Sequence, residues 1–155
     1  MSEHFLVKGL YGRKPLSGEV SVQGAKNAAL KMLAATILFE DEVSLAKVPH
    51  IEDVEKMIDL LESIGAEVES DLPQVRVRAP KEGNTRVDSD IAKKMRSSLV
   101  LMGPVLARYG EVTLPHPGGD VIGARPIDLS IEGFQKMGAS FEVGGDQYYL
   151  SAPQG

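Results

Sequence analysis

The sequence predicts a fold of the α/β class, built of two consecutive βαβαββ units, and three observations support this prediction. Some segments carry apolar residues at helical spacing, whereas others alternate apolar and polar residues as half-buried strands do. Glycine, proline and aspartate separate these segments where turns are expected. The second half of the chain also resembles the first half, which indicates a repeated unit.

The repeat is visible at two places in the chain. Lys26 opens a stretch rich in alanine, leucine and methionine, and Arg96 opens a similar stretch about 70 residues later. The Gly-Ala pair at Gly65 has a counterpart at Gly138. The alignment therefore sets Lys26 and Arg96 at equivalent positions of the two units.

Each unit is expected to contain a strand, a helix, a strand, a helix and two further strands. The first unit covers residues 17–84. Its clearest elements are strands at Glu19–Val22 and Gln74–Arg78, a helix with apolar positions between Ala29 and Ile37, and a helix over Val54–Ile64.

The second unit covers residues 85–155. Its expected elements are helices at about Ile91–Arg108 and Ile127–Met137 and strands at Glu111–Leu114, Ala139–Val143 and Gln147–Ser151.

Turn chemistry supports these boundaries. Gly65 and Gly138 follow helical patterns, where a left-handed residue commonly ends a helix. The segments Ser70–Pro73 and Gly144–Asp146 lie between strands and predict hairpin turns. We expect the helices to cover one face of a sheet.

Composition narrows the classes of function. The chain has 155 residues, 17 Lys+Arg and 22 Asp+Glu, and a formal charge of −5. It lacks a block of basic residues, which argues against a nucleic-acid interface or a membrane-binding patch.

It contains no cysteine, and its three histidines are far apart, so neither a metal site nor a cofactor is expected. The amino terminus has no targeting pattern and no apolar run is long enough to span a membrane, which favours a cytoplasmic protein.

Three segments could carry chemistry. Lys26 and Asn27 follow a glycine at the expected start of a helix, where N–H groups and a cation suit a phosphate or carboxylate. The alternative is that Asn27 caps the helix and Lys26 is solvated. Arg96 occupies the equivalent place in the second unit. Cations at equivalent positions of two repeated units indicate a shared anionic ligand. The alternative is that Arg96 is an ordinary surface residue, as most lone helical arginines are.

The third segment is 114–129, in which three prolines and three glycines separate a strand from a helix. Long ordered loops in compact domains are usually functional, so this one could cover a ligand. Its glycines match neither the dinucleotide-binding nor the P-loop spacing. An ordinary loop would leave Asp120 and Arg125 as solvated charges.

Together these segments resemble the enolpyruvyl transferase family, and most closely its members that act on UDP-N-acetylglucosamine. The resemblance rests on the strings Gly-Ala-Lys-Asn at 24–27, Lys-Met-Arg-Ser-Ser at 94–98, and Gly-Gly-Asp through Ile-Gly-Ala-Arg-Pro-Ile-Asp-Leu at 118–129. The related shikimate-pathway enzymes carry a Ser-Lys-Ser motif near the start and are therefore the less similar branch.

The resemblance implies a reaction and a fold. The reaction transfers the enolpyruvyl group of phosphoenolpyruvate to the 3-hydroxyl of UDP-N-acetylglucosamine and releases phosphate. This step belongs to peptidoglycan precursor synthesis, and so to cell wall biogenesis, cell shape and division. The fold is an inside-out α/β barrel of two domains, each of three βαβαββ units. Residues 1–16 would then belong to the second domain, and the chain would lack the third unit and most of that domain.

The resemblance also implies residue roles. Lys26 and Asn27 would lie at the phosphoenolpyruvate and sugar site, and Arg96 and Arg125 would hold anionic groups. The nucleotide-sugar site would be lined by Arg125, Pro126, Ile127, Asp128 and Leu129. Asp120 stands where most members have a cysteine that acts as a general acid and is alkylated by the epoxide antibiotic fosfomycin, so Asp120 implies insensitivity to that drug.

The short chain leaves alternatives open. As an amino-terminal fragment it is expected to be inactive alone and to pair with the remainder of the enzyme, or with itself through exposed faces. It could instead be a non-catalytic module that binds a nucleotide sugar or assists assembly, or a relic whose site residues are solvated.

Overall fold

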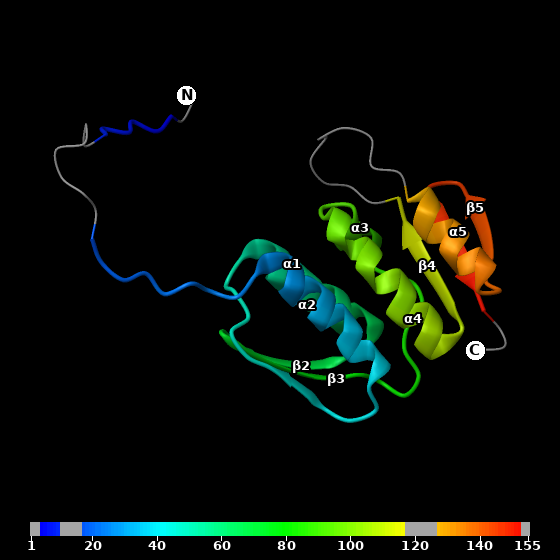
Figure 1. The fold of residues 1–155 in the computed structure, drawn as a ribbon. Helices are drawn as coiled ribbons and strands as arrows, with labels where there is room; N and C mark the ends of the chain where they lie inside the picture. The colour runs from blue at the N-terminus through cyan, green and yellow to red at the C-terminus, as the bar shows by residue number, and fades with distance from the viewer. Residues whose placement is uncertain (1–3, 10–16, 117–126, 153–155) are drawn as a thin grey trace.

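The computed structural model describes residues 4–9, 17–116 and 127–152, which form two three-stranded antiparallel sheets joined by a layer of helices (Figure 1). The α/β class predicted from the sequence is confirmed. Residues 4–9 and 17–21 are exposed and lie apart from the helices and sheets (Figure 1).

The first half contains helix α1 (Lys26–Ala35), which continues into the 3-10 turn η1 (Thr36–Leu38), and helix α2 (Glu52–Ile64). Its strands are β1 (Val43–Leu45), β2 (Glu67–Asp71) and β3 (Gln74–Arg78), in the order β1-β3-β2. The register pairs Val43 with Val77 and Val68 with Val77 on opposite sides of the central strand.

The second half contains the short helix α3 (Ser89–Ala92), the 3-10 segment η2 (Arg96–Leu101) and helices α4 (Met102–Tyr109) and α5 (Asp128–Lys136). Its strands are β4 (Glu111–Pro115), β5 (Ser140–Gly144) and β6 (Gln147–Ser151), in the order β4-β6-β5. In both sheets the last strand in sequence is central. A duplicated unit predicts this correspondence, and the unit boundaries at 17–84 and 85–155 stay a prediction.

Two expected elements differ in the structure. Glu19–Val22 is not a strand: in the part of the chain that the structure describes, no strand pairs with it, and Val20 and Val22 are almost fully exposed. In the second half, the residues before α3 form only an isolated parallel bridge between Arg86 and Thr113.

The helix expected over Ile91–Arg108 is broken into α3, η2 and α4. Met95 has an extended backbone (φ −142°, ψ 125°), which interrupts the helix before Arg96. Pro104 has no N–H to donate, and it falls in the first turn of α4, where that loss is tolerated. Helix α5 and the strands of the second sheet agree with the expected ranges within about two residues.

The expected turns are confirmed. Gly65 and Gly138 have φ values of 103° and 100°, in the left-handed region that follows many helices. The hairpin between β5 and β6 turns at Gly145 and Asp146, and Gly145 has φ 61°. The hairpin between β2 and β3 turns at Leu72 and Pro73.

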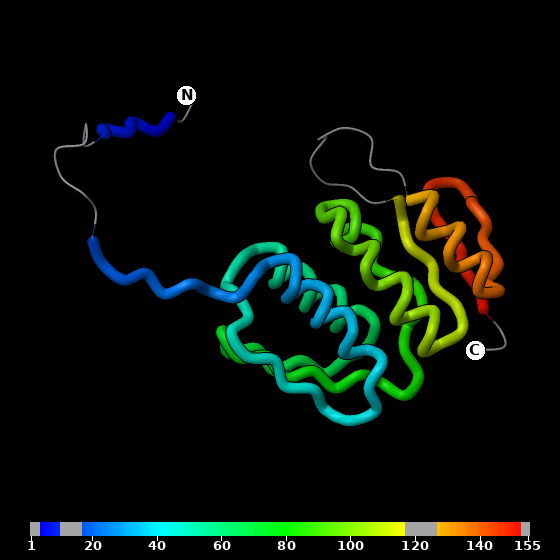
Figure 2. Tube along the Cα trace, viewed as in Figure 1, coloured from blue at the N-terminus to red at the C-terminus, as the bar shows by residue number. Residues whose placement is uncertain are grey.

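One continuous hydrophobic core joins the two halves. Helix α1 packs on α2 and on η2, and α4 packs on η1. Leu33, Ile37, Leu101 and Val105 from these elements have no exposed surface. Figure 2 shows that the two helical segments, α1–η1 and η2–α4, start at the same end of the molecule and run in the same general direction.

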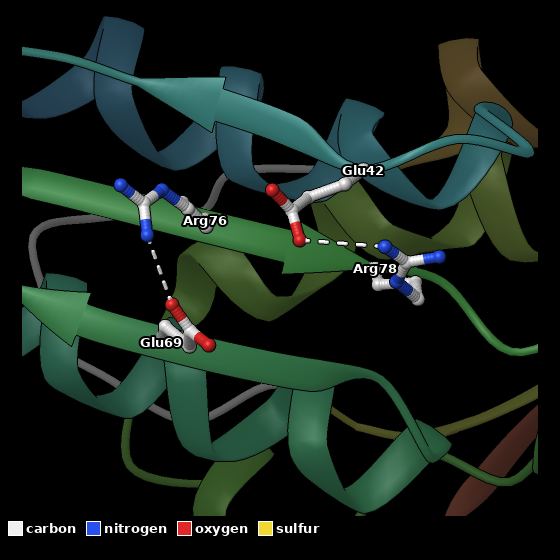
Figure 3. A network of polar contacts seen from close by, with 4 residues as sticks. All are labelled: Glu42, Glu69, Arg76 and Arg78. Atoms are coloured by element: carbon white, nitrogen blue, oxygen red, sulfur yellow. Dashed lines mark hydrogen bonds and ion pairs between the residues drawn. The ribbon is translucent and has the colours of Figure 1, made fainter.

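The opposite face of the first sheet is exposed and charged (Figure 3). Val75 and Val77 of β3 are buried, whereas the alternating Arg76 and Arg78 are exposed, as the period of two predicts. Arg76 pairs with Glu69 at 3.1 Å and Arg78 with Glu42 at 3.5 Å. Exposed pairs of this kind contribute about 0–1 kcal/mol, so they keep this face polar rather than stabilise the fold.

Among the described residues, no helix has the length and apolar character needed to cross a membrane.

We predict that Gly133→Ala stabilises the chain. Gly133 lies inside α5, and a methyl group at this position would meet nothing within 4 Å. Alanine should therefore raise the free energy of unfolding by about 0.5–1 kcal/mol, because glycine loses more backbone freedom on folding. Urea unfolding measures the effect. The matched control is Gly138→Ala, which must lower stability because Gly138 has positive φ. Equal effects of the two substitutions would contradict the assigned backbone.

Candidate active site

Lys26 lies at the start of α1 and forms an ion pair with the first turn of α2. Its Nζ is 2.5 Å from Asp53 Oδ2, and the Lys26 side chain is 54% exposed. The ammonium group therefore remains accessible to an anionic ligand. The attraction to Asp53 fixes the position of the Lys26 ammonium group and contributes little to the free energy of unfolding.

Asn27 does not cap the helix. The N-cap residue of α1 is Ala25, which forms no side-chain cap hydrogen bond, and Asn27 is the second residue of the helix. The alternative interpretation of Asn27 as a cap is therefore wrong. Its exposed side chain is next to Lys26, at the end of the helix where backbone N–H groups lack partners in the preceding turn.

The backbone before Lys26 is held by a close approach at Gly24. A Cβ atom on Gly24 would lie 1.9 Å from the carbonyl oxygen of Lys47, so only glycine fits. Lys47 itself has a left-handed backbone, with φ 59°. This contact sets the path of the chain into α1, and with it the position of Lys26.

Arg96 is the first residue of η2, the segment that packs on α1. Its side chain is half-buried. Asp128 is the first residue of α5, Ile127 is its N-cap, and Leu129 is 81% exposed. Asp120, Arg125 and Pro126 lie outside the described residues.

The charges of Arg96 and Asp128 both act on the hydroxyl of Tyr148, a residue of β6 that the sequence interpretation did not select. Burial raises the pKa of the Tyr148 hydroxyl; the positive charge of Arg96 opposes this shift, and the negative charges of Asp128 and Asp146 add to it. The groups are therefore close enough for their charges to interact.

Three further residues complete this group. The Tyr148 hydroxyl and His116 Nδ1 are 3.0 Å apart and form a hydrogen bond. Lys93 Nζ lies 2.5 Å from Asp146 Oδ2. The hydrogen bond and the charge of Lys93 lower the pKa of the Asp146 carboxyl below its ordinary value.

The structure thus brings the described candidates to two places. Lys26 is held at Asp53, whereas Arg96 and Asp128 are both near enough to Tyr148 for their charges to act on its hydroxyl. Within residues 4–9, 17–116 and 127–152, no group of three or more His, Asp or Glu side chains could hold a metal ion.

The chain belongs to the family described as EPSP synthase (3-phosphoshikimate 1-carboxyvinyltransferase), whose pattern matches residues 10–154. Among curated proteins it is similar to the UDP-N-acetylglucosamine 1-carboxyvinyltransferase of Cellvibrio japonicus, with 43% identity over 92% of this chain and 34% of that protein. It is 44% identical to the protein of the same name from Fervidobacterium nodosum, with the same coverage.

The solved structures agree on the fold. The enolpyruvyl transferase NikO from Streptomyces tendae superposes with a TM-score of 0.75 at 20% identity, over 92% of this chain and 31% of that one. An EPSP synthase from Acinetobacter baumannii gives 0.63 at 16% identity, over 88% of this chain and 32% of that one. The fold is therefore that of enolpyruvyl transferases. The chain spans about a third of the length of the curated relatives it matches.

We predict that Gly24→Ala destabilises the chain by about 2 kcal/mol or more, because the new methyl group would overlap the Lys47 carbonyl oxygen. Chemical denaturation measures the loss. Gly9→Ala is the control, since a Cβ there meets nothing within 4 Å. If both variants unfold at the same urea concentration as the parent chain, the close approach at Gly24 is not present in solution.

Proposed function

We propose that this chain is part of an enzyme that transfers the enolpyruvyl group of phosphoenolpyruvate to the 3-hydroxyl of UDP-N-acetylglucosamine. The identity of 43% to an enzyme of that name carries the proposal. Two features support it: an accessible cation at the start of α1, and Arg96 and Asp128, whose charges both act on the Tyr148 hydroxyl.

Lys26, Arg96 and Arg125 are proposed to bind the phosphate and carboxylate groups of the two substrates. Charge-assisted hydrogen bonds to such groups contribute about 1.5–3 kcal/mol each, which exceeds the effect of a net charge of −5 spread over the surface. Asn27, Pro126, Ile127, Asp128 and Leu129 are proposed to contact the sugar and the nucleotide.

Asp120 is proposed as the general acid. The 3-hydroxyl oxygen bonds to the enol carbon and gives up its proton to a base, while the methylene carbon takes up a proton, which a protonated carboxyl group can deliver. Loss of phosphate, together with a proton from the new methyl group, then restores the double bond. No step in this sequence requires an oxidant or a reductant.

Residues 1–16 are proposed to belong to a second domain. Phe5, Leu6 and Val7 are each at least 86% exposed, as expected of apolar residues that pack elsewhere in a longer protein. Leu129 and Met137, which border an apolar groove between α4 and α5, are also exposed. We propose that the remainder of the enzyme, or a second copy of the chain, covers these side chains.

We predict that the 155-residue chain binds UDP-N-acetylglucosamine at millimolar concentration but releases no phosphate in the presence of both substrates. Positioning of two substrates supplies about 7–11 kcal/mol of a barrier, and a third of the enzyme cannot provide it. Saturation-transfer NMR measures binding, and a phosphate assay measures turnover.

Charge-matched variants show whether the binding is at the proposed site. Lys26→Met and Arg96→Met should each weaken it at least about tenfold, since each removes a charge-assisted bond. Lys31→Met, on the exposed side of α1, is the control and should bind as the parent chain does. Absence of a saturation-transfer signal, or equal affinity in all three variants, would count against the proposed site. Phosphate release at enzymatic rates would show that the chain is catalytically complete.

We predict that the enzyme containing Asp120 is insensitive to fosfomycin. A carboxylate attacks an epoxide poorly, yet a carboxyl group can still donate a proton. Asp120→Cys should introduce time-dependent inactivation, and Asp120→Ala should lower the rate by about 10²–10⁴, the usual contribution of general acid catalysis. Steady-state assays with and without the drug test both statements. Full activity in Asp120→Ala would remove Asp120 from the mechanism.

A further inference from the structure

The first turn of α2 carries three carboxylates, and each contacts a different side chain. Glu52 pairs with Lys56 of the same helix at 2.7 Å, and Glu55 lies 2.9 Å from the histidine just before the helix. Asp53 pairs with Lys26 at the start of α1. Of these three contacts, the one between Asp53 and Lys26 joins two helices.

The Asp53 carboxylate is carried by a short side chain on a well-packed helix. Val54 and Met57, its neighbours on α2, have no exposed surface, and α2 packs on α1. Lys26, by contrast, has a long flexible stem and is 54% exposed, so its ammonium group can occupy many positions when it has no partner. The ion pair with Asp53 therefore selects one of these positions.

The ion pair leaves Lys26 able to bind a ligand. A lysine ammonium group has three N–H donors, and Asp53 Oδ2 lies 2.5 Å from Nζ, where it accepts from one of them. An anionic group that reaches the exposed part of the side chain can therefore bind without breaking the ion pair. Asp53 also places a negative charge beside this group, and that charge by itself repels an anion. Positioning and repulsion thus have opposite effects on binding.

We propose that Asp53 is a positioning residue that holds the Lys26 ammonium group in place for the anionic group of the substrate. The proposal rests on the proposed function for its ligand, but the order of the Lys26 side chain can be measured without a ligand. Asp53 acts through Lys26 rather than on the reacting atoms. Loss of its charge should therefore weaken the binding of an anion, although removal of a negative charge alone would strengthen it.

The first test measures the motion of lysine ammonium groups by NMR in the 155-residue chain without ligand. Asp53→Asn removes the charge and nearly keeps the shape, and it should lower the order parameter of Lys26 Nζ. Glu52→Gln is the matched control, because it removes the same charge from the same turn. It should lower the order parameter of Lys56 Nζ and leave that of Lys26 unchanged. If Lys26 is equally ordered in the parent chain and in Asp53→Asn, the proposal fails.

The second test measures affinity for UDP-N-acetylglucosamine by NMR titration. Asp53→Asn should raise the dissociation constant about fivefold, the equivalent of one hydrogen bond, whereas Glu52→Gln should not raise it. Both variants should melt close to the parent chain, because exposed ion pairs contribute little to stability, so a loss of affinity would not reflect unfolding. An unchanged or lower dissociation constant in Asp53→Asn would overturn the proposal, because repulsion would then equal or outweigh positioning.

A double-mutant cycle tests whether Asp53 acts through Lys26. In a chain that already carries Lys26→Met, the further change Asp53→Asn should not weaken binding again. A second fivefold loss in this chain would overturn the positioning role, since Asp53 would then contact the ligand itself. If the parent chain does not bind UDP-N-acetylglucosamine, the proposed function fails at this point, and the ligand-free order parameters still decide whether Asp53 positions Lys26.

Discussion

The packing of α1–η1 against η2–α4 is the contact on which the rest of the structure depends. Each sheet has three strands and one apolar face, and helices remove that face from water. Leu33 and Ile37 from one half and Leu101 and Val105 from the other are fully buried in the same core, so each half completes the apolar surface of the other. Burial of each such side chain contributes about 1.5–3 kcal/mol to stability. This is more than an exposed ion pair of the first sheet contributes.

This packing also places the candidate site. Because α1 and η2–α4 run in the same general direction, their first residues, Lys26 and Arg96, lie at the same end of the helical layer (Figure 2). The close approach at Gly24 fixes the entry to α1, and the junction of Lys93 with Asp146 fixes the entry to η2. The backbone that leads into α1 thus sets where Lys26 lies, and the ion pair with Asp53 holds its ammonium group.

Much of this arrangement could be predicted from the sequence. Alternation in β3 and helical spacing in α2 reflect burial on one face, and both elements follow that pattern. The prediction of a strand at Glu19–Val22 was wrong, because the alternation of apolar and polar residues does not show whether a partner strand exists. The break before Arg96 was missed because apolar spacing continues through it; Pro104 marks only the first turn of α4, further along the chain. The contact between Tyr148 and His116 could not be predicted, since the two residues are 32 apart in the sequence and no motif links them.

Native-state hydrogen exchange in low concentrations of urea tests most directly whether the shared helical layer carries both sheets. The account predicts that amides of β3 and β6, the two central strands, exchange through one opening reaction with the same free energy as amides of α1 and α4. The contradicting result is that the amides of the first sheet exchange fully while those of β4, β6 and α4 remain protected. The two halves would then be stable independently, and the packing between them would not hold the candidate site in place.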